Sequence, residues 1–126
     1  MAVYYHYTIE GRPITKKNSQ RIVTHGNRPI IIQSKQYEQY EKTALWQLRR
    51  DRPKQPIDYP VEVSCKYFMP TRRRVDLLNL MAATHDILVK AGILKDDNFK
   101  IIYSVDGSRV MYDKDRPRVE IEIKAP

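Results

Sequence analysis

Asp76 and the pair Asp96-Asp97 are the carboxylates of this chain whose surroundings suggest metal chemistry. Three consecutive arginines, at positions 72–74, come directly before Val75 and Asp76. Carboxylates that bind Mg²⁺ must converge from different parts of a fold, and neighbouring arginines can hold the phosphates of a polyanionic substrate. This combination predicts a site for Mg²⁺ and phosphate. The structural alternative is that Asp76 only caps a helix and that Asp96-Asp97-Asn98 only forms a turn.

One helix is expected between these two groups of carboxylates. The residues that recur at helical spacing are Leu77, Leu80, Met81, Thr84, Leu88 and Ala91. Gly92 follows Lys90-Ala91 and is a typical helix stop. Asp76 would lie in the first turn, where a carboxylate suits the positive end of the helix dipole. The residues Asp76, Asn79, Ala83 and Asp86 would then share a polar face, separate from the buried one.

The remaining pattern predicts an α+β fold, with a mixed β-sheet and helices packed on it. Alternating or β-rich runs at residues 3–9, 61–68, 99–105, 109–112 and 119–123 are typical of strands, and a hairpin is expected at 21–24 and 29–33. A second helix should begin near Ser34 and run to residue 48, with loops or linkers at 10–20, 49–60 and 113–118. The residues at helical spacing in this helix are Tyr37, Tyr40, Ala44, Leu45 and Leu48. The tyrosines and Trp46 could stack on bases, but a stripe at this period is typical of core, and we do not assign these residues to DNA. The length fits a single domain over residues 1–126.

Composition favours a folded protein with a polyanionic partner. The chain is 41% hydrophobic and 30% charged, and its net charge is +8. No apolar run approaches the ~20 residues needed to span a bilayer, and the first residues show no signal-peptide pattern, so we expect a cytoplasmic protein with no membrane contact. Cys65 is expected to be a buried, reduced thiol, and no His/Cys spacing suggests zinc.

Two motifs resemble a known family. Arg72-Arg73-Arg74-Val75-Asp76-Leu77-Leu78-Asn79-Leu80, followed by the helix and by Ala91-Gly92-Ile93-Leu94-Lys95-Asp96-Asp97, resembles the signature of the RusA-type Holliday junction resolvases, in their phage- or prophage-like branch. Gly11-Arg12-Pro13-Ile14-Thr15-Lys16-Lys17-Asn18-Ser19 is similar to the segment that follows the first strand in that family. The resemblance implies a RusA-like endonuclease domain over nearly the whole chain.

The resemblance also implies an activity and a set of roles. The activity would be a Mg²⁺-dependent, structure-selective endonuclease that resolves Holliday junctions by paired symmetric nicks in DNA recombination and repair, acting as a homodimer on four-way junction DNA. Asp76 and Asp97 would bind the metal, with Asp96 as a third ligand or supporting residue, and Asn79 would orient Asp76 or contact a metal-bound water. Lys16, Lys17, Asn18, Arg72, Arg73 and Arg74 would contact the DNA backbone.

Two positions depart from the family pattern. Leu78 stands where the family usually has a second aspartate, and Ala82 stands where a lysine is common. One possibility is that Asp86 or Asp106 completes the site and that His85 or Lys90 supplies a proton or charge, although helical spacing places His85 away from Asp76, so packing or surface is expected for it. A second is a non-catalytic basic protein that binds junctions or other DNA. A third is a general basic interaction domain.

Overall fold

The structure, a computed structural model, describes residues 3–16, 20–33 and 35–125. The principal element of this part of the chain is a five-stranded mixed sheet. Its central strand β4, Val61–Met69, is antiparallel to β7, Arg118–Ala125, and β7 also pairs with the edge strand β1, Val3–Glu10. Along its other edge, β4 pairs in parallel with β5, Ile102–Ser104, near its start and with β6, Arg109–Tyr112, near its end.

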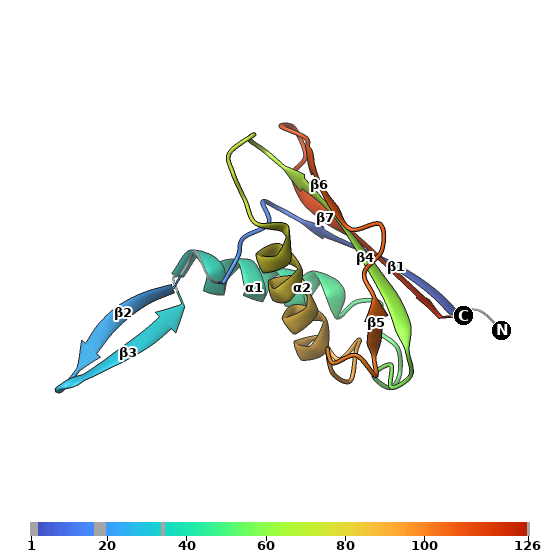
Figure 1. The fold of residues 1–126 in the computed structure, drawn as a ribbon, viewed down its shortest axis with the longest axis horizontal. Coiled ribbons are helices and arrows are strands. Elements are labelled where there is room, and N and C mark those ends of the chain that lie inside the picture. The colour runs from blue at the N-terminus through green and yellow to red at the C-terminus, as the bar shows by residue number, and fades with distance from the viewer. Residues whose placement is uncertain (1–2, 17–19, 34, 126) are drawn as a thin grey trace.

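Two helices pack on one face of this sheet (Figure 1). They are α1, Lys35–Leu48, and α2, Leu77–Lys90. Buried and half-exposed side chains alternate along the whole of β4, which is the pattern of a sheet with one covered and one solvated face. The inner face of the sheet and both helices share one hydrophobic core. The predicted α+β architecture is therefore confirmed. In the described part of the chain, no helix is long and apolar enough to cross a membrane.

The stripe predicted along α1 forms the buried face of this helix, but it does not include Trp46. Tyr37, Tyr40, Ala44 and Leu48 are buried, as their spacing of three and four residues requires. Leu45, which also belongs to the predicted stripe, is half-buried. Trp46, which lies outside the stripe, is 66% exposed. Two helical residues rotate the side chain by about 200°, so a position midway between Ala44 and Leu48 faces solvent.

α2 begins and ends where the sequence predicts. Gly92, with φ +80°, adopts the left-handed conformation just after the helix, and only glycine does so without strain. The predicted polar face is wrong at Ala83, which is 2% exposed, and Asp86 is only half-exposed. The reason is that this side of α2 faces α1, where Lys90 donates a hydrogen bond to Glu41.

The segment after α2 and the segment between α1 and β4 differ from the expected strand and linker. β5 is shorter than the predicted 99–105, because the backbone N–H groups of Ile101 and Ile102 donate to the carbonyl of Asn98 and form a turn. The linker predicted at 49–60 packs against the body: Ile57 is buried and donates its N–H to the carbonyl of Ile93 at 2.8 Å. Both differences depend on contacts between distant residues.

The predicted hairpin is confirmed as a separate two-stranded sheet, formed by β2, Gln20–His25, and β3, Arg28–Gln33. His25 pairs with Arg28 across a two-residue turn in which Gly26 has φ +65°. Two-residue hairpin turns favour glycine because they require positive φ. Figure 1 shows this hairpin projecting away from the sheet and helices.

Candidate functional site

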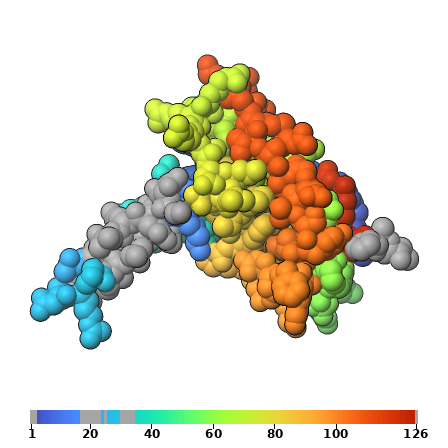
Figure 2. All heavy atoms as spheres, viewed as in Figure 1, coloured from blue at the N-terminus to red at the C-terminus, as the bar shows by residue number. Residues whose placement is uncertain are grey.

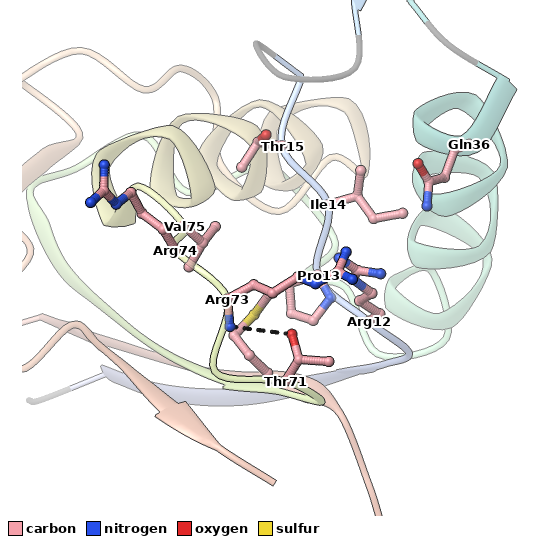
Figure 3. A pocket seen from close by; sticks show the side chains of 10 residues that line it. Arg12, Pro13, Ile14, Thr15, Gln36, Thr71, Arg73, Arg74 and Val75 are labelled. Atoms are coloured by element: carbon pink, nitrogen blue, oxygen red, sulfur yellow. Dashed lines mark hydrogen bonds between the residues drawn. The ribbon is translucent and has the colours of Figure 1, made fainter. Parts of the chain in front are cut away.

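Three segments that are distant in the sequence meet around a pocket of about 200 Å³. They are residues 12–15 after β1, the first turn of α1, and residues 69–75 between β4 and α2. The residues that line it are Arg12, Pro13, Ile14, Thr15, Gln36, Met69, Thr71, Arg73, Arg74 and Val75. Figure 3 shows Arg12 and Gln36 on one side of this pocket and Arg74 and Val75 on the other. We call it the arginine pocket.

The arginine pocket is positively charged. Its guanidinium groups belong to Arg12, Arg73 and Arg74, and none of the lining residues is acidic. Among the residues that the structure describes, these three arginines have no ion pair with a carboxylate. A guanidinium group can hold a phosphate through two parallel hydrogen bonds. The pocket therefore suits a phosphate group of an extended polyanion.

Arg72 lies apart from the two arginines that follow it. Its guanidinium carbon is 4.3 Å from the centroid of the Tyr112 ring on β6, in a cation–π arrangement. Arg72 does not line the arginine pocket. The three arginines predicted as a group are thus divided, with Arg73 and Arg74 at the pocket and Arg72 on the exposed edge of the sheet.

Lys16 lies in an ion-pair network between the N-terminal loop and both helices. Its Nζ is 2.9 Å from Asp86 Oδ2, Lys90 Nζ is 3.3 Å from the same oxygen, and Lys90 also pairs with Glu41 at 3.0 Å. Partial burial alone would raise the pKa of Asp86, but the hydrogen bond from Lys16 and the charges of both lysines outweigh burial and lower that pKa. Lys16 thus carries an internal partner, and Asp86 is not free to complete a metal site. Lys17 and Asn18, also predicted to contact DNA, lie outside the described residues.

Asp76 is the N-cap of α2. Its Oδ1 accepts hydrogen bonds from the backbone N–H groups of Leu78, at 2.9 Å, and of Asn79, at 3.3 Å. These are two of the N–H groups that a helix start leaves without a partner. Asp76 is exposed, and in the described part of the chain its Oδ2 has no hydrogen-bond donor. The capping alternative is therefore confirmed, and it leaves one oxygen available to a ligand.

Asp96 and Asp97 have different environments within the loop after α2. Asp96 Oδ1 accepts from the N–H of Asp97 at 2.7 Å, and Asp96 Oδ2 accepts from the side-chain amide of Asn98 at 3.0 Å. Both oxygens of Asp96 are thus used within the turn. The Asp97 side chain is exposed and lies close enough to His85 for its negative charge to act on the imidazole. Of the two residues, Asp97 is the one available to bind a cation.

The face of α2 that Asp97 approaches is the face that carries the departures from the family pattern. Leu78, Ala82 and His85 are spaced by four and three residues, so they lie in a row along the helix. Leu78 is 69% exposed and Ala82 is exposed. His85 is half-buried, and its Nε2 has no hydrogen-bond partner among the described residues. Burial lowers the pKa of His85, and this effect outweighs the negative charge of Asp97, which by itself would raise that pKa. Figure 2 shows α2 and the segment that follows it side by side on one face of the molecule.

The residues fit Mg²⁺ only in part. Within residues 3–16, 20–33 and 35–125, no three His, Cys, Asp or Glu side chains lie close enough to hold a metal ion. The set Asp76, Asp96 and Asp97 therefore does not form a preassembled cluster in this structure. Mg²⁺ commonly keeps several waters and is held by one or two carboxylates together with substrate phosphates. Asp76 and Asp97 each offer a carboxylate oxygen, which is the contribution that such a site takes from a protein.

Arg12 is a pocket residue that was not singled out in the sequence. It lies within the motif at residues 11–19, in which Lys16 and Lys17 were the cations predicted to contact DNA. The sequence holds one indication of this role. Arg12 lies two residues after the first strand and next to Pro13, and a proline restricts the direction that the loop can take. Which of these cations meets Arg73 and Arg74 depends on how the loop crosses the helices.

A basic α+β domain with an arginine-lined pocket beside a carboxylate-capped helix has the charge distribution typical of proteins that bind nucleic acids. Residues 10–124 match the family model described as endodeoxyribonuclease RusA, so the chain belongs to that family. A segment of 59 residues is 36% identical to the crossover junction endodeoxyribonuclease RusA of Aquifex aeolicus. That segment covers 47% of this chain and 47% of the relative, so the match spans about half the length of the relative.

Proposed function

We propose that this chain is a structure-selective endonuclease that resolves Holliday junctions by paired symmetric nicks, with Mg²⁺ as the metal ion. The family to which it belongs is named for an endodeoxyribonuclease, and the relative in Aquifex aeolicus is named for cleavage of crossover junctions. The observation that carries the proposal is that the wall of the arginine pocket leads directly into the cap of α2. Residues 73–75 line the pocket, and Asp76 follows them.

This continuity supports a division of tasks between the arginines and the carboxylates. Arg73, Arg74 and Arg12 would hold the backbone phosphate and offset its negative charge. Asp76 would be held in place by its two backbone hydrogen bonds, because a side chain that caps a helix has little freedom to rotate. Asn79 would support the Asp76 carboxylate from the first turn of α2.

Asp76 and Asp97 would be the residues that hold Mg²⁺, with DNA phosphate oxygens completing the site. When bound, Mg²⁺ supplies activation of an attacking water and stabilisation of negative charge on the phosphorus. Asp96 would act as a supporting residue, since its hydrogen bonds shape the turn that presents Asp97.

A second candidate function is binding of DNA junctions without cleavage. Leu78 and Ala82 are both exposed on the face that Asp97 approaches. A leucine cannot bind a metal ion, and an alanine cannot stabilise a leaving group. Both candidates use the arginine pocket, and only nicking distinguishes them.

The proposal includes a homodimer, since a four-way junction has two-fold symmetry and two matched nicks require two sites. Cleavage of a labelled synthetic four-way junction in Mg²⁺, with a linear duplex as control substrate, tests the proposal. We expect paired nicks that EDTA abolishes and that Asp97→Asn removes, while Asp115→Asn, which alters an exposed carboxylate in another loop, retains them. Tight junction binding without nicks in the unmodified chain would establish the second candidate function.

The salt dependence of binding tests the arginine pocket separately from nicking. If Arg12, Arg73 and Arg74 each neutralise one phosphate, the affinity of one protomer should fall by about 40-fold between 50 and 200 mM salt, from a slope of about −0.9 per phosphate. Replacing Arg73 with Gln should reduce that slope by about one phosphate contact. An affinity that does not change with salt would contradict the role given to the pocket.

A further inference from the structure

The arginine pocket is the first of three hollows that follow one another along α1. A second hollow shares Arg12, Ile14 and Gln36 with the arginine pocket. A third hollow shares Gln39 and Thr43 with the second. The three hollows therefore adjoin one another, and Gln36, Gln39, Thr43 and Trp46 mark their course along one side of the helix. We call this course the α1 groove.

The far end of the α1 groove combines an exposed aromatic ring with unpaired cations. Trp46 is 66% exposed, and the guanidinium carbon of Arg50 is 5.1 Å from its ring centroid. Lys42 and Arg49 line the same hollow. In the described part of the chain, none of these three cations has a carboxylate partner. The acidic residue in the row of hollows is Glu10, which is paired with Arg116.

These features match single-stranded DNA better than other partners. Cations that follow a groove bind the phosphate backbone, and an exposed aromatic ring stacks on a base. In a duplex the faces of the bases are covered by stacking on their neighbours. Trp46 can therefore stack only on the base of an unpaired nucleotide. A second copy of this chain would bring the same cations against Lys42, Arg49 and Arg50 in a two-fold interface, and like charges would repel each other.

We propose that the α1 groove binds an unpaired DNA strand that leaves the arginine pocket, with a base of that strand stacked on Trp46. The helical rise places Trp46 about 15 Å beyond Gln36, a distance that a short stretch of an unpaired strand can span. This inference rests on the proposed function for the DNA in the arginine pocket. It does not require that the DNA be cleaved.

The fluorescence of Trp46 reports this contact directly, because the chain has one tryptophan. Titration with a 16-nucleotide oligothymidylate at low salt is expected to quench the emission to a plateau, whereas a duplex with the same number of phosphates leaves it unchanged. Because Trp46→Leu has no tryptophan, its binding is followed by the fluorescence anisotropy of an end-labelled oligothymidylate; it should be weaker than that of the unmodified chain by about 5- to 150-fold, the range for loss of one stacked base. Tyr4→Leu, which removes an exposed aromatic ring from β1 outside the groove, should leave binding unchanged. Arg50→Gln should weaken binding more than Lys114→Gln.

Several results would overturn the proposal. They are emission that the oligothymidylate does not change, equal binding by Trp46→Leu and the unmodified chain, or emission that shifts to the blue with protein concentration when DNA is absent. The last result would assign this face to a contact between copies. Junction nicking measured on the same variants separates the two proposals. Quenching without nicking would support the groove and contradict the nuclease, and nicking without quenching would do the reverse.

Discussion

The two roles of Asp76 can be separated by comparing Asp76→Ala with Asp76→Asn. In the folded chain Asp76 Oδ1 accepts the backbone N–H groups of Leu78 and Asn79. Substitution by alanine removes this cap. Substitution by asparagine keeps the cap, because the side-chain carbonyl can accept the same hydrogen bonds, and removes only the negative charge. The first change tests stability and charge together, and the second tests charge alone.

The expected effect on stability follows from the cap. Loss of an N-cap side chain costs about 1 kcal/mol. With an unfolding entropy of about 2.1 cal/mol/K per residue over 126 residues, this cost lowers the melting temperature by about 4 °C. Asparagine caps a helix as well as aspartate, and loss of the charge at an exposed helix start costs at most about 0.5 kcal/mol in moderate salt, or about 2 °C.

The assay is thermal unfolding followed by circular dichroism, paired with junction nicking in Mg²⁺. We expect Asp76→Asn to retain its melting temperature within about 2 °C and to lose nicking, because an amide does not replace an anionic metal ligand. Asp76→Ala should lose both. If Asp76→Asn nicks as well as the unmodified chain, Asp76 is only a cap and the ligand role is wrong. If alanine leaves the melting temperature unchanged, the capping argument itself fails.

Three further predictions concern the framework of the site. Thr84→Val should destabilise the chain by about 1–3 kcal/mol in urea unfolding, because the buried Tyr67 hydroxyl donates to Thr84 Oγ1 at 2.8 Å and would lose its acceptor; adding Tyr67→Phe should recover part of the loss. The hydrogen bond and charge of Lys16 lower the pKa of Asp86 in the folded chain. The stability that Asp86 contributes is therefore complete above its unfolded pKa of 3.8 and is lost as the pH falls through its folded pKa. Asp86→Asn should reduce the change of unfolding free energy with pH in this acidic range. Gly107→Ala should destabilise by about 1–2 kcal/mol or more, since φ is +88° and the new Cβ would lie 2.9 Å from a serine oxygen of β4; an unchanged urea midpoint would contradict this.

Much of the fold could be predicted because it depends on neighbours in the sequence. Local sequence patterns predicted three features that the structure contains. They are the strand β4 from its alternation, the helix α2 from its spacing, and the end of α2 at Gly92. The shortened β5 and the packed linker could not be predicted. Asn98 and Ile57 bond to backbone groups whose positions are decided only when α2 and the sheet are assembled.

The candidate site divides in the same way. The sequence by itself determined that Asp76 starts a helix, that Asp97 follows that helix in a turn, and that a basic segment precedes Asp76. Each of these relations spans only a few residues. The tertiary structure decided that Arg12 joins Arg73 and Arg74 and that Lys16 pairs with Asp86. These relations depend on which distant surfaces pack together. A helix buries one of its faces only when the surface that covers this face is in place.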